Sequence, residues 1–169
     1  AREREHTRMQ PAPVGESLRA TFAPRFHLLS ELGRGAMATV YLAHEAPKDR
    51  YVALKVLAER FHGTDEAARF RREARVLTTL RHPHILRAYD VGSAGPHDWY
   101  SMPFIAGESL RERLDRERRL RIDEACQLAI DILGALAHSH AFDIVHRDVK
   151  PDNVLLSAKG ALLADFGIA

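Results

Sequence analysis

The sequence predicts an α+β fold in two parts, in which a five-stranded antiparallel sheet with one helix precedes a mainly helical part. Up to about residue 105, short segments rich in apolar and β-branched residues alternate with turns that contain Gly or Pro. After Gly107, apolar residues recur every three or four positions, as in an amphipathic helix. The two patterns meet near residues 103–107, which we take as the boundary between the parts.

Composition and charge exclude several classes of protein. The 169 residues are 46% hydrophobic and 28% charged, as in an ordinary globular protein. The net charge of +2 is too small to indicate a nucleic acid partner. No uncharged apolar run is long enough for a membrane segment, and the first ten residues lack the apolar core of a signal peptide. We therefore expect a cytoplasmic chain, and a membrane anchor elsewhere in a longer parent protein remains compatible with it.

The first part of the chain is predicted to begin with a leader and three strands. Residues 1–24 combine charged residues with three prolines and show no sustained period, so we expect them to be flexible. From Phe26 onwards, strands are predicted over residues 26–34, 38–46 and 50–57.

A helix and two further strands complete the predicted sheet. Over residues 64–80, an apolar face with a period of three or four also includes Glu73, the one polar residue on that face. The strands that follow are predicted over residues 85–93 and 98–105.

The strongest helical pattern covers residues 122–140 and is followed by a predicted loop and hairpin. We expect one stripe of this helix to face the core, with the chain's single cysteine as a buried thiol on it. The stripe consists of Ile122, Cys126, Ala129, Leu133, Leu136 and His140.

A glycine pair between the first two strands is the first candidate for binding. Gly33 and Gly35 with Val40 fit a hairpin that covers a nucleotide and offers backbone N–H groups to its phosphates. A plain hairpin turn explains these glycines equally well.

A lysine and a glutamate form the second candidate. Lys55 lies on a predicted apolar strand, and a lysine inside a cleft needs an acid to offset its desolvation. Glu73, on the inward face of the helix, can supply that acid. A surface ion pair between Glu73 and Arg69 is the alternative.

The most specific motif is His146-Arg147-Asp148-Val149-Lys150-Pro151-Asp152-Asn153. The pattern H-R-D-x-K-P-x-N arises by chance in a chain of this length only a few times per million. Asp165-Phe166-Gly167 follows at a distance that leaves room for a short hairpin, which brings a second carboxylate beside the amide of Asn153.

Together these motifs resemble the eukaryotic-type (Hanks-type) serine/threonine protein kinases of bacteria, as do FRREARVLTTLRHPHIL and MPFIAGESL. The resemblance extends from about Phe26 to Ala169 and ends at the D-F-G motif. It implies a two-lobed protein-kinase-like fold, with a leader at 1–24, an N-lobe at 25–105 and a partial C-lobe at 106–169. The activation segment and the later helices of such a domain are absent.

The resemblance implies transfer of the ATP γ-phosphate to a Ser or Thr hydroxyl of a protein. Lys55 would bind the α and β phosphates, and Glu73 would hold Lys55. Asp148 would accept or orient the proton of the substrate hydroxyl, and Lys150 would stabilise the γ-phosphate. The alternative is a truncated fragment that binds nucleotide or a partner without turnover.

The resemblance also implies sites for Mg²⁺ and for the nucleotide. Asn153 and Asp165 would bind Mg²⁺ through oxygen atoms. Ala38 replaces the third glycine of the family's G-x-G-x-x-G, which alters how the loop covers the phosphates. The remaining nucleotide contacts are implied for Leu32, Gly33, Gly35, Val40, Ala53, Met102, Pro103, Ile105 and Leu155. The identity of the protein substrate is not encoded in these motifs.

Overall fold

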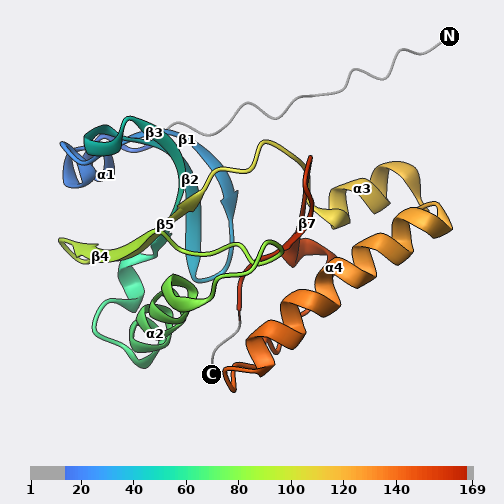
Figure 1. Cartoon of the computed structure of the whole chain (residues 1–169). Coiled ribbons are helices and arrows are strands. Elements are labelled where there is room, and N and C mark those ends of the chain that lie inside the picture. The colour runs from blue at the N-terminus through green and yellow to red at the C-terminus, as the bar shows by residue number, and fades with distance from the viewer. Residues whose placement is uncertain (1–13, 167–169) are drawn as a thin grey trace, which may run out of the picture.

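The computed structural model describes residues 14–166, which form two parts (Figure 1). The sheet and its two helices form one part, and two further helices with a small hairpin form the other. The helices are α1 (Glu16–Phe22), α2 (Asp65–Thr79), α3 (Leu110–Glu117) and α4 (Ile122–His140). The strands are β1 (Phe26–Arg34), β2 (Ala38–Glu45), β3 (Arg50–Leu57), β4 (Asp90–Ala94), β5 (His97–Pro103), β6 (Val154–Ser157) and β7 (Gly160–Leu163).

The five-stranded antiparallel sheet is confirmed, with strand order β1-β2-β3-β5-β4. The fourth strand was predicted to start at residue 85, but β4 begins at Asp90. Residues 85 and 86 run elsewhere because their backbone pairs with the second part: Ile85 forms a parallel bridge with Leu163, and the Leu86 N–H donates to the Leu163 carbonyl at 2.9 Å. The chain returns to the sheet at Tyr89, whose N–H donates to the Ser101 carbonyl of β5 at 2.7 Å. The side chains of Ile85, Leu86 and Ala88 are buried, which explains the strand-like sequence pattern.

The sheet separates two apolar clusters, and β3 contributes to both by the period-two alternation of a strand. Ala53 and Leu57 belong to the larger cluster, which includes α2, α4 and the β6–β7 hairpin. Val52, Leu54 and Val56 belong to the smaller cluster on the opposite face. A strand covered on both faces accounts for the continuous apolar run in this part of the sequence.

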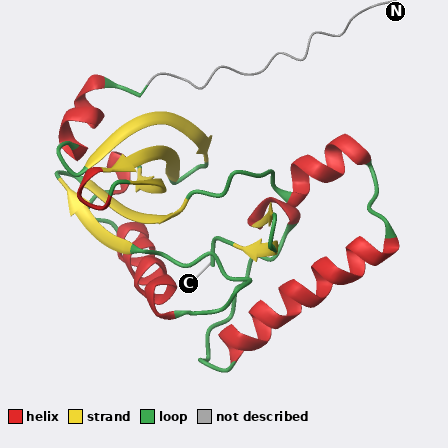
Figure 2. Ribbon diagram, turned by 45° about the horizontal axis from the view of Figure 1, so that its top comes forward, coloured by secondary structure: helices red, strands yellow, loops and turns green. Residues whose placement is uncertain are grey.

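The leader prediction is wrong for its second half, because residues 16–22 form α1 (Figure 2). Val14, Leu18 and Phe22 recur at steps of four and pack in the smaller cluster, where the Phe22 ring meets Phe26 edge-on at 6.5 Å between centroids. Burial of this apolar stripe offsets the cost of ordering the segment. Residues 1–13 of the predicted leader lie outside the described residues.

Arg25, just after α1, joins an ionic cluster at the fully buried carboxylate of Glu45. Lys48 and Arg50 pair with the same carboxylate at 3.1 and 2.7 Å, and Arg25 also pairs with Asp90. Although burial alone would raise the pKa of Glu45, hydrogen bonds from Arg50, Lys48 and Arg25 lower it. These contacts fix the entry of the chain into β1.

The helix at residues 122–140 is confirmed as α4, but its predicted core face is wrong. Ile122 is 85% exposed, Leu133 is 63% exposed, and Cys126 is exposed rather than a buried thiol. Ala129 and His140 are exposed as well, and Leu136 alone of that stripe is partly buried. The buried residues are Leu128, Asp131, Ala135 and Ser139.

Polar side chains explain this error, because the face that packs against β7 includes an aspartate and a serine. Asp131 accepts hydrogen bonds from the Ala161 N–H at 3.0 Å and from the Gln127 amide at 2.9 Å. The Ser139 hydroxyl donates to the Leu136 carbonyl at 3.0 Å. An apolar period cannot identify a buried face that satisfies its polar groups internally.

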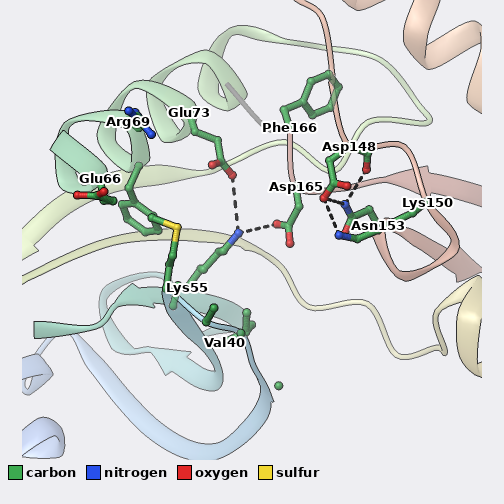
Figure 3. Close-up of a pocket in the computed structure, with 16 residues that line it drawn as sticks. Val40, Lys55, Glu66, Arg69, Glu73, Asp148, Lys150, Asn153, Asp165 and Phe166 are labelled. Atoms are coloured by element: carbon green, nitrogen blue, oxygen red, sulfur yellow. Dashed lines mark hydrogen bonds and ion pairs between the residues drawn. The ribbon is translucent and has the colours of Figure 1, made fainter. Parts of the chain in front are cut away.

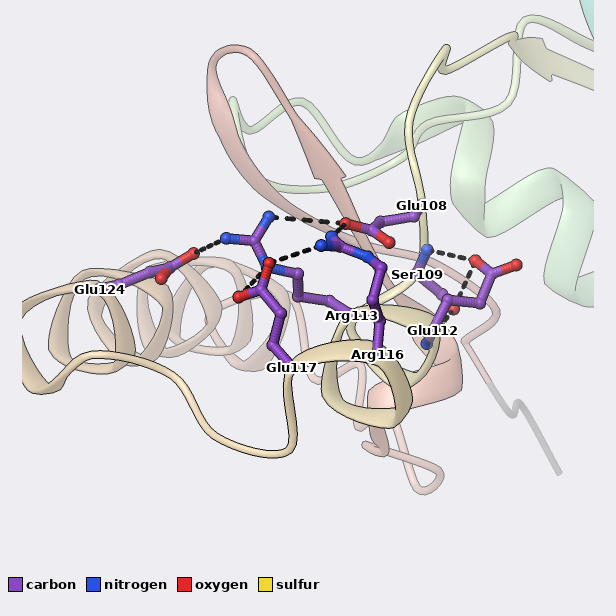
Figure 4. A network of polar contacts seen from close by, with 7 residues as sticks. All are labelled: Glu108, Ser109, Glu112, Arg113, Arg116, Glu117 and Glu124. Carbon is purple, nitrogen blue, oxygen red and sulfur yellow. Dashed lines mark hydrogen bonds and ion pairs between the residues drawn. The ribbon is translucent and has the colours of Figure 1, made fainter. Parts of the chain in front are cut away.

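Arg113 anchors α3 to its neighbours (Figure 4). Its guanidinium lies 3.5 Å from Glu108 in the linker between β5 and α3 (residues 104–109) and 3.3 Å from Glu124 in α4, and it also pairs with Glu117. Ser109 and Glu112 form a capping box at the start of α3. These contacts fix the position of α3 directly after the linker between the two parts.

Within residues 14–166, no helix has the length and apolar character to cross a membrane.

Candidate active site

A cavity of about 630 Å³ lies between the two parts and gathers the charged candidate residues. The turn between β1 and β2 lines one side, α2 and β3 the rear, and the loop before β6 and the end of the described chain the other side. Lys55 lies between Glu73 and Asp165, whereas Asp148, Lys150 and Asn153 are grouped beyond Asp165 (Figure 3). The chain therefore brings Lys55 and Asp165, which are 110 positions apart in the sequence, together in one cleft.

Lys55 pairs with two carboxylates across the cavity. Its Nζ lies 2.8 Å from Oδ1 of Asp165 and 3.7 Å from Oε1 of Glu73. Burial alone would lower the pKa of Lys55, but the charges of Asp165 and Glu73 outweigh it and raise the pKa. The predicted pairing with Glu73 is thus present, and among the described residues Glu73 forms no ion pair with Arg69.

Glu73 is held by a second group that the sequence did not reveal. The phenol hydroxyl of Tyr100 donates to Oε1 of Glu73 at 3.1 Å. Burial raises the pKa of Glu73, while the charge of Lys55 and the hydrogen bond from Tyr100 oppose that rise. Tyr100 lies opposite Lys55 in the β3–β5 register and two residues from Met102, so the period of a strand places it on the cavity side.

Asp148, Lys150 and Asn153 form a compact group on the loop before β6. Lys150 Nζ lies 2.7 Å from Oδ2 of Asp148, and the Asn153 amide donates to the Asp148 carbonyl at 2.8 Å and to its carboxylate at 3.0 Å. The hydrogen bond from Lys150 is the main cause of the lowered pKa of Asp148. Asp148 is therefore an ionised acceptor on an exposed surface.

His146 fixes the loop that carries Asp148, Lys150 and Asn153. Its Nε2 donates to the Ala164 carbonyl at 2.9 Å, and its Nδ1 accepts the Asp148 N–H at 3.3 Å, which is the pattern of a neutral ring. Burial lowers the pKa of His146, in agreement with that neutral state. The Phe166 ring packs 4.5 Å from the histidine ring, and Gly167 of the D-F-G motif lies outside the described residues.

The β6–β7 hairpin sets the distance between Asn153 and Asp165. Asn153 directly precedes β6 and Asp165 is the second residue after β7, so the pairing of the two strands brings the end of the hairpin back beside its start. The Ala164 N–H closes this arrangement by donating to the Asn153 carbonyl at 2.8 Å. Asp165 has a φ of +55°, a left-handed conformation that is uncommon for residues other than glycine and is found at functional sites.

The glycine hairpin covers one side of the cavity, where Gly33 and Gly35 both lie. The Gly35 N–H donates to the Ala38 carbonyl at 2.8 Å, which closes the turn. The turn is also anchored from outside, because Arg60 donates to the Ala36 carbonyl and the Ala58 N–H donates to the Met37 carbonyl. The turn is therefore held on its outer side by these two hydrogen bonds.

The predicted apolar contacts are brought together only in part. Ala53 and Met102 are paired across β3 and β5, and Val40, Ile105 and Leu155 pack against the same cluster. Of the residues predicted for this apolar region, Val40 alone lines the large cavity. Leu32 is 45% exposed, and Pro103, opposite Val52 in the sheet register, is partly exposed.

The chemistry of the two candidate magnesium ligands fits a hard cation. Asn153 donates through Nδ2, which leaves its Oδ1 as an acceptor, and the Asp165 carboxylate faces the same cavity. Within residues 14–166, no three His, Cys, Asp or Glu side chains are arranged to hold a metal ion by themselves.

Comparison with known proteins agrees with this geometry. The family model for the protein kinase domain matches residues 26–169. The chain is 41% identical over 151 residues to the probable serine/threonine-protein kinase PknB of Lactococcus lactis, covering 88% of this chain and 24% of that protein. It is 39% identical over 147 residues to the serine/threonine-protein kinase PrkC of Bacillus subtilis, covering 86% and 23% respectively.

Solved structures give the same result. The kinase domain of PknI from Mycobacterium tuberculosis superposes with a TM-score of 0.74 at 36% identity, covering 86% of this chain and 59% of that chain. The present chain spans about a quarter of the length of these two curated relatives.

Proposed function

Because this chain belongs to the protein kinase domain family, we propose that it forms the nucleotide site and catalytic loop of a protein serine/threonine kinase. The enzyme would transfer the γ-phosphate of ATP to a Ser or Thr hydroxyl of a protein. Residues 25–105 would form the N-lobe and residues 106–169 part of the C-lobe. The observation that carries this proposal is the cavity in which Lys55 and Asp165 face the Asp148, Lys150 and Asn153 group.

Nucleotide binding would break the Lys55–Asp165 ion pair and give each of the two side chains a stronger partner. Lys55 and Asp165 neutralise each other in the structure, and an ATP phosphate is a better partner for the ammonium group, as Mg²⁺ is for the carboxylate. Lys55 would bind the α and β phosphates while Glu73 keeps its position. Bound Mg²⁺, held by Asn153 and Asp165, would neutralise phosphate charge.

The adenine base would lie against the apolar cluster next to the linker. Val40 and Ala53 would cover one side, Leu155 the other, and Met102 the rear. Leu32 would close over the base at the mouth, which is consistent with its exposure here. The backbone of Pro103 and Ile105 would bind the adenine edge, and Gly33 and Gly35 would cover the phosphates.

Asp148 and Lys150 would act on the transferred group. The ionised Asp148 carboxylate can accept or orient the proton of the acceptor hydroxyl. Lys150, 2.7 Å from that carboxylate, can place its charge on the γ-phosphate while remaining close to Asp148. Asn153 fixes Asp148 through two hydrogen bonds, so the acceptor-binding and metal-binding groups form one unit.

We further propose a cytoplasmic location for this domain, where ATP is available, with ATP and a protein substrate as its partners. The small net charge and the alternation of basic with acidic residues support a protein rather than a nucleic acid substrate.

Two measurements test the proposal, on this chain and on a protein that contains the complete kinase domain. The first is a thermal melt with and without Mg²⁺-ATP. A ligand at 100 times its Kd adds about 2.7 kcal/mol to the free energy of unfolding. The second is transfer of labelled phosphate to protein, the kinase itself included.

We expect Asp148→Asn in the complete domain to abolish transfer while the melt still shifts with Mg²⁺-ATP, because Asp148 acts on the acceptor hydroxyl. A complete domain that binds nucleotide but labels no protein would support the alternative, a binding module without turnover. A large loss of ATP affinity in Asp148→Asn would instead assign this carboxylate to the metal.

A further inference from the structure

We propose that Tyr100 is a positioning residue that holds the Glu73 carboxylate in place for Lys55 through its phenol hydroxyl. This inference rests on the proposed kinase function. It assigns to β5 a polar contribution to the site in addition to the Lys55–Glu73 pair.

The contact is specific in its geometry. The Tyr100 hydroxyl donates to Oε1 of Glu73 at 3.1 Å, and the same oxygen lies 3.7 Å from Nζ of Lys55. One carboxylate oxygen therefore receives both the ammonium group and the phenol. Because Tyr100 comes from β5 and Lys55 from β3, the two donors approach Glu73 from neighbouring strands.

Tyr100 has little freedom to move away from this position. Its side chain is fully buried, and its ring packs 5.2 Å from the ring of Phe70, one turn before Glu73 on α2. The Lys55 ammonium group lies 5.6 Å from the centre of the Tyr100 ring, within reach of a cation–π contact. The tyrosine thus contacts both members of the pair, one through its hydroxyl and the other through its ring.

The hydroxyl has an electrostatic task that a purely apolar side chain cannot fulfil. Burial favours the neutral form of Glu73 and raises its pKa, and a donated hydrogen bond favours the ionised form that Lys55 requires. Burial and the nearby charges of Asp165 and Glu73 raise the pKa of Tyr100 well above its ordinary value. The phenol therefore stays protonated and remains a donor across the whole working pH range.

The contact becomes more important when nucleotide binds. In the structure, Lys55 is closer to Asp165 than to Glu73, so the lysine is shared. Bound phosphates and Mg²⁺ would attract Lys55 and Asp165. They would not displace the phenol of Tyr100, because it is buried and uncharged. Tyr100 would then be a contact of Glu73 that persists through the change.

A purely structural role for Tyr100 is the competing explanation, and α2 offers the means to separate the two. Arg71 on α2 pairs with the buried Asp98 at the start of β5 at 2.7 Å, which ties the helix to the same strand without involving Glu73. Removal of the Tyr100 hydroxyl alone therefore leaves α2 anchored, and the ring of phenylalanine keeps the packing against Phe70.

The test is Tyr100→Phe in a protein that contains the complete kinase domain. We expect kcat/KM for ATP to fall about 10-fold, which corresponds to about 1.4 kcal/mol, with the melting temperature close to that of the parent. The matched control is Tyr41→Phe, which removes the hydroxyl of another buried tyrosine in the smaller apolar cluster on the opposite face of the sheet. The control should leave kcat/KM unchanged.

The pH dependence of kcat/KM gives a readout that packing alone would not change. Without the phenol donor, the pKa of Glu73 rises, so the acid limb of the profile should move to higher pH in Tyr100→Phe and stay in place in Tyr41→Phe. Besides Tyr100, the groups that face Glu73 are Lys55 from β3 and Asp165 from the segment after β7. The Tyr100 hydroxyl also interacts with Asp165, so a shift of the acid limb is assigned to Glu73 only if it disappears in the Glu73→Gln background.

A double-mutant cycle with Glu73→Gln completes the design. If Tyr100 acts through the Glu73 carboxylate, adding Tyr100→Phe to Glu73→Gln should lower kcat/KM for ATP by at most about 2-fold more. Equal additional losses in both backgrounds, an unshifted acid limb, or unfolding of Tyr100→Phe would each overturn the positioning role. Absence of phosphate transfer in the parent protein would instead refute the proposed function, so the two failures are distinguishable.

Discussion

Gly107 lies where the linker between the two parts passes the backbone of β6, and Gly107→Ala should separate these two segments. A Cβ atom at this position would lie 2.1 Å from the Leu156 carbonyl oxygen, whereas ordinary contacts begin at 3.4 Å. The linker would have to move by about 1.3 Å. That shift breaks the hydrogen bond from the Leu156 N–H to the Glu108 carbonyl, now 2.9 Å long.

The expected cost combines two contributions. Loss of one backbone hydrogen bond costs about 1 kcal/mol, and overpacking at an unyielding backbone costs about 1–3 kcal/mol. The free energy of unfolding should therefore fall by about 2–4 kcal/mol. For a domain of this size, about 2–4 °C of melting temperature corresponds to each kcal/mol. Calorimetry should thus record a decrease of roughly 5–15 °C.

Gly134→Ala is the matched control, because the same chemical change should have the opposite sign. Gly134 lies inside α4, and its added Cβ would meet the His82 ring at 3.5 Å, an ordinary contact. Alanine is favoured over glycine in a helix interior by about 0.5–1 kcal/mol, so this variant should be stabilised. The steric reasoning at the linker would be refuted if Gly107→Ala melted within about 2 °C of the parent. It would also be refuted if Gly107→Ala changed the melting temperature by no more than Gly134→Ala does.

Two further predictions concern Phe22 in the smaller apolar cluster and Glu45 in the ionic cluster around Arg25. Phe22→Ala should lower the free energy of unfolding by about 3–5 kcal/mol, because the side chain is 3% exposed and joins α1 to the smaller cluster; chemical denaturation checks this, and a change below 1 kcal/mol would mean that α1 is not docked. Glu45→Gln should destabilise the protein at neutral pH, and melts from pH 7 to pH 3 should show the difference shrinking in acid. The pKa of Glu45 is lowered on folding, so its contribution is present above the ordinary value of 4.5 and is lost as the pH falls through the lower folded value. A pH-independent difference would contradict this assignment.

The motif residues of the site could be predicted from the sequence because local spacing determines their positions. Asp148, Lys150 and Asn153 lie within six residues, and one short hairpin returns the chain to Asp165. The Lys55–Glu73 pair needed only a strand and a helix whose inward faces are marked by apolar neighbours. Tyr100 was missed because a tyrosine on an apolar strand is ordinary, and only the register opposite Lys55 brings its hydroxyl to Glu73.

The errors in the fold have a common physical origin, which is that burial depends on partners distant in the sequence. The apolar stripe of α4 around Leu133 is exposed, whereas Asp131 is buried because the β7 backbone satisfies it. Ile85 and Leu86 have the composition of a strand but pair with β7 instead of the sheet. The period of α1 was hidden by the charged residues and prolines around it.

The small β6–β7 hairpin is bonded to two segments that lie far apart in the sequence. β6 bonds to the linker through Leu156 and Glu108, and β7 bonds to the segment at His84–Leu86 through Leu163. Sliding of the hairpin against either segment would break backbone hydrogen bonds. Because Asn153 and Asp165 lie at the two ends of this hairpin, its strand pairing also sets the separation between them.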